Sequence, residues 1–338
     1  MTISQSRRHL LGALPLLKHG AHAPFAAGSV LAGFSGAQAQ SSWPTKPVRL
    51  VIPFPAGGAT DIIGRTLAAR LSTSLGQQVV IENKPGAGTA IGAAYVAKQR
   101  PDGYTLLVAS STFTMAPAVV NTLPFDPVKD FTPIAMIGEV PLALAAKPKS
   151  PGKDAKEYFD YLRATPNLNY GATGVGSIQH FAGVMLSQAL GNNMVAVQYK
   201  GGSPAMTDTM GGHIEFSIGS MTQVLPQIRN GTLRGVAVTS AQRSAAAPEM
   251  PTFQEAGIQD YDIQQWWGLV GPANIDPAIQ VFINTAVNKA LGSKDLIEFL
   301  AADGGQPKPM TVDEFRKVVH DGLVRWATIA KQTGITTE

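Results

Sequence analysis

The sequence predicts an α/β protein with two lobes, and three observations carry this prediction. Short apolar runs alternate with helix-like stretches from residue 47 onward, the order typical of strands covered by helices. The same alternation begins again in the second half of the chain. No low-complexity linker separates the halves, and 338 residues suit two domains of roughly 100–200 residues. We therefore expect two α/β lobes joined by short crossovers, with a cleft between them.

Five apolar runs of the first half are predicted as strands: 48–53, 78–81, 105–109, 134–137 and 142–146. After the first run, apolar side chains recur every four residues from Ile63 to Leu75. This spacing places them on one face of a helix over 62–75. A further helix is predicted over 90–99. Strand, helix and strand at this spacing favour a parallel sheet.

The second half repeats the pattern. Its predicted strands are 169–171, 194–198, 214–218, 233–239 and 267–271, and its predicted helices are 154–164, 179–190, 204–211 and 223–230. After the last strand the chain is mostly helical. The final helix has the clearest signal, because Thr311 and Glu314 form a capping-box pattern before an apolar stripe that includes Phe315 and Trp326.

Crossovers near 142–146 and 262–267 would let the C-terminal segment return to the first lobe. We accordingly predict a first lobe over 40–142, a second lobe over 143–265, and a return to the first lobe over 266–338.

Residues 1–39 have the features of an export signal. Arg7 and Arg8 precede a weakly apolar stretch at 10–17, and the segment ends in the small-x-small pattern of residues 37–39. The string SRRHLL resembles a twin-arginine signal, although Lys18 interrupts the apolar region, so the export route stays open. The stretch at 10–17 and a second small and apolar run at 23–37 are both shorter than the roughly 18–20 residues of a membrane span. We expect a mature periplasmic protein that begins near Gln40.

Composition excludes several function classes. With no Cys, the chain cannot form disulfides, thiolate zinc sites, Fe–S clusters or a cysteine nucleophile. The net charge of +4 includes the three cations of residues 1–39; without them, 24 basic side chains stand against 23 acidic ones. No clustered basic patch remains, so we expect no nucleic-acid partner.

The sequence also offers little sign of metal, cofactor or catalysis. The histidines after residue 39 are far apart, which predicts no metal site. The glycine string 86–92 is one residue too long for a dinucleotide fingerprint, and we expect no cofactor. The local candidate for a nucleophile and base is Ser177 with His180, which leaves an exported small-molecule hydrolase as the alternative function.

A recurring device is a glycine- and hydroxyl-rich turn between a strand and a helix. It occurs at 54–61, 109–112, 171–177 and 199–203. Helix N-termini present unpaired N–H groups and a partial positive charge, and bind carboxylate or phosphate. Each turn alone is also an ordinary helix cap. Their recurrence in both halves predicts a small anion, with more than one acidic group, gripped from both lobes.

These strings resemble a known family. The matching segments are WPTKPVR (43–49), PFPAGGATD (53–61), ENKPGAG (82–88), PDGYTL (101–106), GVGS (174–177) with His180, YKGG (199–202), Arg243 through PT (251–252), EAG (255–257) and WGL (267–269). In this order, over nearly all of 43–338, they are similar to the extracytoplasmic solute receptors of the tripartite tricarboxylate transporter class, the Bug family.

The resemblance implies a type II periplasmic-binding-protein fold without catalysis. It implies a monomer that holds a carboxylate through main-chain groups, hydroxyls and waters and passes it to membrane permease subunits. Ligand-binding residues implied in the first lobe are Phe54, Ala56, Gly57, Gly58, Thr60, Asp61, Ser110 and Ser111. Those implied in the second lobe are Thr173, Val175, Gly176, Ser177 and His180, with Lys200 and Gly201 at the rim.

One departure from the family pattern concerns the ligand. Phe54 stands where the family usually has Tyr. An aromatic carboxylate such as terephthalate or nicotinate is therefore as plausible as an aliphatic di- or tricarboxylate. Trp266 and Trp267 could stack on such a ring; the alternative is that one anchors the core and the other lies at the surface or hinge.

Overall fold

The structure is a computed structural model, and it describes residues 43–336. The expected export signal lies outside these residues. In the described part, no helix combines the length and apolar character that crossing a membrane requires.

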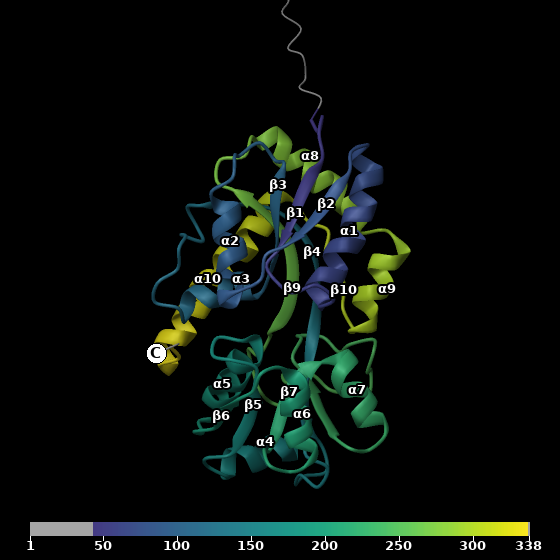
Figure 1. Cartoon of the computed structure of the whole chain (residues 1–338). Helices are drawn as coiled ribbons and strands as arrows, with labels where there is room; N and C mark the ends of the chain where they lie inside the picture. The colour runs from purple at the N-terminus through teal and green to yellow at the C-terminus, as the bar shows by residue number, and fades with distance from the viewer. Residues whose placement is uncertain (1–42, 337–338) are drawn as a thin grey trace, which may run out of the picture. The chain divides into compact units, whose positions relative to one another are not determined.

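The first lobe is built on a small sheet with helices on its faces (Figure 1). Its elements are β1 (Val48–Ile52), α1 (Ala59–Leu75), β2 (Val79–Asn83), η1 (Ala87–Thr89), α2 (Ala90–Ala97), β3 (Thr105–Ser110), α3 (Thr112–Met115) and η2 (Ala116–Ala118). Strand β1 pairs in parallel with both β2 and β3, as the strand and helix alternation predicts.

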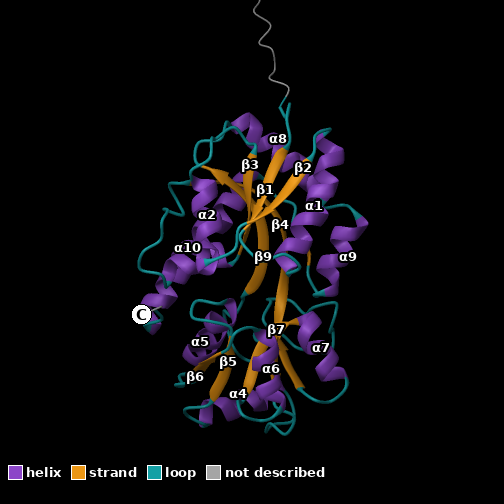
Figure 2. Ribbon diagram, in the orientation of Figure 1, coloured by secondary structure: helices purple, strands orange, loops and turns teal. Residues whose placement is uncertain are grey.

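The second lobe repeats this arrangement. Its elements are α4 (Ala155–Ala164), β5 (Asn169–Ala172), α5 (Ile178–Leu190), β6 (Val195–Gln198), α6 (Gly202–Met210), β7 (Phe216–Ser220), α7 (Met221–Arg229) and β8 (Arg234–Val238). Strand β5 pairs in parallel with β6 and β7. Figure 2 shows these strands and helices grouped apart from those of the first lobe.

Two long strands connect the lobes and make the sheet mixed instead of parallel throughout. They are β4 (Phe131–Ala146) and β9 (Gln264–Pro272), which run antiparallel to each other. The strand order is β2-β1-β3-β9-β4-β7-β5-β6, and β8 and β10 (Gln306–Pro307) also pair with β4. Strand β4 pairs with β9 as far as Pro141 and with β7 from Leu142 onward.

The prediction of two separate strands at 134–137 and 142–146 was wrong, because β4 is one strand of 16 residues. The apolar pattern breaks at Gly138 and Glu139, but the strand does not. At Gly138 an added Cβ would lie 2.6 Å from Leu300 Cδ1, so the glycine admits a neighbouring helix. Glu139 forms an ion pair with Lys308 next to β10.

The last part of the chain is helical. It contains α8 (Pro277–Ala290), α9 (Lys294–Ala302) and α10 (Val312–Thr333). The capping box predicted at the start of α10 is present, since Thr311 and Glu314 each accept the other's main-chain N–H.

Helix α10 packs against both lobes. Near its start, Phe315 lies in the same apolar cluster as Trp266 and Val270 of β9. Near its end, Trp326 packs on Phe181 of α5, with ring centroids 5.1 Å apart. The C-terminal segment therefore packs against the second lobe as well as the first.

Candidate ligand-binding site

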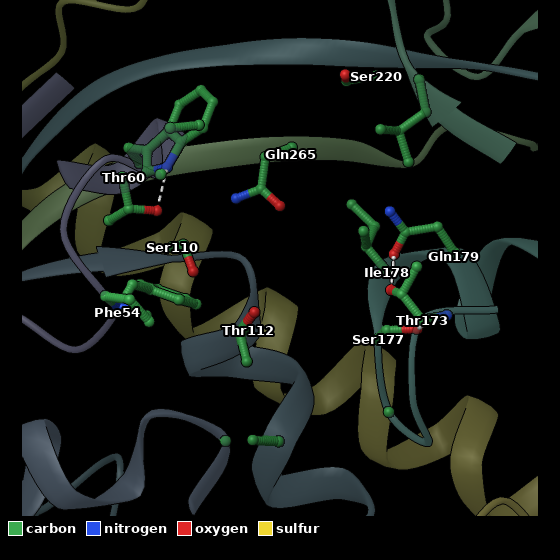
Figure 3. A pocket seen from close by; sticks show the side chains of 18 of the residues that line it. Phe54, Thr60, Ser110, Thr112, Thr173, Ser177, Ile178, Gln179, Ser220 and Gln265 are labelled. Atoms are coloured by element: carbon green, nitrogen blue, oxygen red, sulfur yellow. Dashed lines mark hydrogen bonds between the residues drawn. The ribbon is translucent and has the colours of Figure 1, made fainter. Parts of the chain in front are cut away.

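A pocket of about 820 Å³ opens between the lobes. We call it the interlobe pocket. It is bordered by the loops after β1, β3 and β5, by the start of α7 and by β9. Figure 3 shows Phe54, Thr60 and Ser110 on one side, and Thr173, Ser177 and Gln179 on the other. Loops from both lobes thus meet at one cavity.

Hydroxyl, amide and main-chain groups dominate the polar part of this cavity. Among the described residues that line it, none is Lys, Arg or His, and Asp303 is the one ionisable side chain. Asp303 follows α9 and accepts the N–H of Thr222, in the first turn of α7, at 2.7 Å. Any anion held here would be held by neutral donors and helix N-termini, not by an ion pair.

The loop after β1 is held by Asp61, which is buried in the first turn of α1. Asp61 Oδ2 accepts the N–H of Gly57 at 2.9 Å and Nε of Arg65 at 2.8 Å. The side-chain amide of Asn83 donates both to Asp61 Oδ1 and to the carbonyl of Phe54. The hydrogen bond from Arg65, with those from Gly57 and Asn83, outweighs burial and lowers the pKa of Asp61 to about 2. The carboxyl is therefore ionised at neutral pH.

The loop after β5 is held by side chains of α5. Ser177 caps this helix, and its Oγ accepts the N–H groups of His180 and Thr173. Thr173 Oγ1 donates to Gln179 Oε1 at 2.8 Å (Figure 3). His180 Nδ1 accepts the N–H of Gly176 at 3.3 Å, and burial lowers the pKa of its imidazole.

The Ser177 and His180 pair lacks the arrangement of a nucleophile and its base. The Ser177 oxygen faces two main-chain donors, as expected of a helix cap. The imidazole nitrogen Nδ1 has Gly176 as its partner. A general base must lie within hydrogen-bonding reach of the proton that it removes. Here Ser177 Oγ and His180 Nδ1 instead accept main-chain N–H groups that hold the loop.

The structure brings nine of the fifteen predicted site residues to the interlobe pocket. They are Phe54, Ala56, Gly58, Thr60, Ser110, Thr173, Val175, Gly176 and Ser177. The remaining predicted residues do not line it: Gly57, Asp61, Ser111, His180, Lys200 and Gly201.

Other contacts account for most of these six residues. Gly57, Asp61 and His180 are engaged in the loop bonds described above. Ser111 is buried and donates to Gln265 Oε1 at 2.8 Å. Lys200 and Gly201 follow β6, an edge strand of the sheet. Their loop runs beside the pocket, since a Cβ added at the adjoining Gly202 would lie 2.8 Å from Oε1 of the lining residue Gln223, but neither Lys200 nor Gly201 lines it.

Several lining residues were not among the predicted ones. Ser220 ends β7 directly before α7, and the strand-then-helix turn was the signal that could have found it. Val119 and Asp303 belong to segments without such a turn, and no local pattern marks them. Trp267 lines the pocket, whereas Trp266 packs edge-on against Phe315 in the core.

No group of His, Asp and Glu side chains within residues 43–336 is arranged to hold a metal ion.

Two α/β lobes joined by long antiparallel strands, with a ligand-sized pocket between them, define a periplasmic-binding-protein fold. The chain belongs to the tripartite tricarboxylate transporter family receptors, whose family model matches residues 63–335. The family is one of substrate-binding receptors and not of enzymes, so the prediction of a binding protein is confirmed and the hydrolase alternative is set aside.

Relatives support this assignment over most of the chain. The protein BugT of Bordetella pertussis is 35% identical over 306 residues, which cover 90% of this chain and 94% of BugT. A solved structure described as a periplasmic transporter is 36% identical with a TM-score of 0.74, covering 88% of this chain and 100% of that one. The R. palustris protein Rpa4515, solved with adipate, is 33% identical with a TM-score of 0.74, covering 87% and 99%.

Proposed function

We propose that this chain is the periplasmic receptor of a tripartite tricarboxylate transporter, and that it binds a small carboxylate in the interlobe pocket. The observation that carries this proposal is the meeting of glycine- and hydroxyl-rich loops from both lobes at one cavity, whose lining within residues 43–336 includes no cationic side chain. A receptor of this kind would deliver its ligand to membrane permease subunits.

The chemistry of the loops suits a carboxylate. The first N–H groups of α1 and α5 have no partner within their helices and carry part of the helix dipole. Charge-assisted hydrogen bonds to a carboxylate contribute roughly 1.5–3 kcal/mol each. A few of them, less the ordering costs, correspond to a micromolar dissociation constant, about −8 kcal/mol.

The proposed contact residues are the nine predicted residues that line the pocket, with Thr112, Gln179 and Gln265 added from the structure. The proposed lobes are 40–142 with 266–338, and 143–265. Closure of these lobes would bring the two loops onto the ligand from opposite sides.

Both ligand classes remain in the proposal. A relative that was solved with adipate favours an aliphatic dicarboxylate. Phe54 and Trp267 give the pocket two aromatic faces, which would also suit terephthalate or nicotinate.

Titration calorimetry with adipate, citrate, terephthalate and nicotinate tests the proposal, with the neutral adipamide as control. We expect at least one acid to bind with micromolar affinity and adipamide to bind far more weakly. Ser110→Ala and Thr173→Val should each weaken that acid roughly threefold to tenfold, since each removes a hydroxyl at the pocket.

A second cavity offers a matched control. It lies in the first lobe, and its lining includes the cationic side chains of Lys129 and Arg316 beside the carboxylate of Asp276. Arg316→Ala should leave affinity unchanged. If Arg316→Ala abolishes binding while Ser110→Ala and Thr173→Val do not, the site is misplaced.

Export, assembly and delivery need their own measurements. A fusion of residues 1–45 to a reporter should leave the cytoplasm, and sedimentation should give a monomer. Uptake of labelled acid by cells that carry the permease subunits should require this chain.

A further inference from the structure

The two loops that face each other across the interlobe pocket are built by the same device. In α1 the third residue, Asp61, accepts the N–H of Gly57, which precedes the helix cap. In α5 the third residue, His180, accepts the N–H of Gly176, which also precedes the cap. Both bonds span four residues.

Both glycines adopt a backbone that other residues avoid. The φ angle is +87° at Gly57 and +77° at Gly176. A positive φ is accessible to glycine but costly for residues with a Cβ. The loop must reverse at these points, and the acceptor on the helix holds the reversed N–H in place.

The two acceptors, Asp61 and His180, are buried side chains outside the lining of the pocket. Asp61 and His180 are 3% and 9% exposed, and neither lines the cavity. Each side chain accepts the N–H of its glycine within the loop. That amide therefore cannot donate to a ligand at the same time. The neighbouring residues Gly58 and Ser177 do line the cavity.

We propose that Asp61 and His180 are paired positioning residues, one in each lobe, which hold the opposed loops in the ligand-ready conformation by accepting a glycine N–H. This inference rests on the proposed function, because it assigns a role in binding. Loops ordered before the ligand arrives do not incur their ordering cost on binding.

The chain contains a control for ordinary helix capping. In α4 the third residue, Glu157, accepts the N–H of Lys153 at 2.8 Å, again across four residues. Neither residue borders the interlobe pocket. Glu157→Ala therefore breaks the same kind of bond in the second lobe without touching the proposed site.

The test compares Asp61→Ala, His180→Ala, His180→Asn and Glu157→Ala. Asn carries Oδ1 at the position of His Nδ1, so His180→Asn keeps an acceptor for Gly176 while it removes the ring. Adipate affinity is measured by calorimetry. Amide hydrogen exchange of segments 54–61 and 171–180 is measured without any acid.

We expect Asp61→Ala and His180→Ala each to weaken adipate binding roughly threefold to tenfold and to speed exchange in their own loop. His180→Asn should recover affinity to within about threefold of the parent. Glu157→Ala should lower the melting temperature but leave affinity and both loops unchanged.

The inference is overturned if the two alanine variants leave adipate affinity intact, or if they leave loop exchange unchanged. It is equally overturned if His180→Asn binds no better than His180→Ala. The exchange measurement needs no ligand, so it separates a failure of loop positioning from a failure of the proposed function, in which the parent protein binds none of the acids.

Discussion

The indole nitrogen of Trp267 donates a hydrogen bond to Thr60 Oγ1 at 3.0 Å, although 207 positions separate the two residues. Trp267 lies on β9, and Thr60 lies in the first turn of α1. Both line the interlobe pocket. The returning strand therefore takes part in building the loop that the first lobe presents to a ligand.

Replacing Trp267 by Phe should show how much this hydrogen bond contributes to stability and to ligand binding. Because Thr60 Oγ1 is buried and loses its donor, the free energy of unfolding should fall by about 1–2 kcal/mol. Urea denaturation measures this, and adipate affinity should fall as well. Trp266→Phe is the control, since Trp266 packs against Phe315 and does not line the pocket. Equal losses of affinity in both variants would contradict the assignment.

Removing the acidic charge of the pocket should change which acids bind best. Asp303→Asn keeps an oxygen that can accept the N–H of Thr222 but removes the charge. We expect citrate and adipate to gain roughly threefold to tenfold in affinity, and nicotinate less, since like charges repel more strongly in a low dielectric.

The gain from Asp303→Asn should shrink between about 20 mM and about 200 mM salt, because Asp303 is only half-buried and its field is screened. Calorimetry at both salt concentrations decides. If citrate gains no more than nicotinate, Asp303 does not contribute to ligand selection.

A methyl group added at Gly176 should hinder the approach of the lobes. An added Cβ would lie 2.4 Å from Val119 Cγ2, which belongs to the first lobe, and the φ of +77° adds backbone strain. We expect Gly176→Ala to weaken adipate by about tenfold or more. The double variant Gly176→Ala with Val119→Ala should recover part of this loss, because it removes the clash but not the strain. No recovery would mean that the contact with Val119 is irrelevant.

The pKa of Asp61 predicts a pH window for its contribution to stability. Its folded pKa is lowered from 3.8 to about 2 by its hydrogen-bond donors, chiefly Arg65. A carboxyl whose pKa is lower in the folded state stabilises the fold at pH values above its unfolded pKa. This contribution is lost as the pH falls from about 4 to about 2.

The difference in melting temperature between the parent and Asp61→Asn should therefore stay constant from about pH 8 to about pH 5 and shrink below about pH 4. Thermal unfolding across this range tests it. A difference that shrinks already between neutral pH and about pH 5 would show that another group controls the effect.

Local patterns in the sequence predicted much of the fold. The four-residue spacing from Ile63 to Leu75 identified α1, and the capping box at Thr311 identified the start of α10. The sequence predicts two separate strands where β4 is continuous, since nothing local reveals that Gly138 makes room for Leu300. Pairing partners were also out of reach, because antiparallel β4 and β9 are about as apolar as the parallel strands beside them.

The site was predictable only where one turn carries both the strand end and the helix start. Thr60, Ser110 and Ser177 lie at such turns and do reach the pocket. Gly201 lies at a similar turn after the edge strand β6, yet it does not line the pocket. Asp303 comes from a distant segment, and no residue near it in the sequence indicates that it bonds to Thr222 of α7.

By itself, the sequence determined the α/β class, the order of most elements and the glycine-rich turns, because helix periodicity, caps and positive φ depend on neighbouring residues. The tertiary structure alone decided the order of the strands, and with it which turns meet at the pocket. It also decided that Asp61 and His180 bond to glycines behind the cavity, because the burial of a side chain depends on segments far away in the chain.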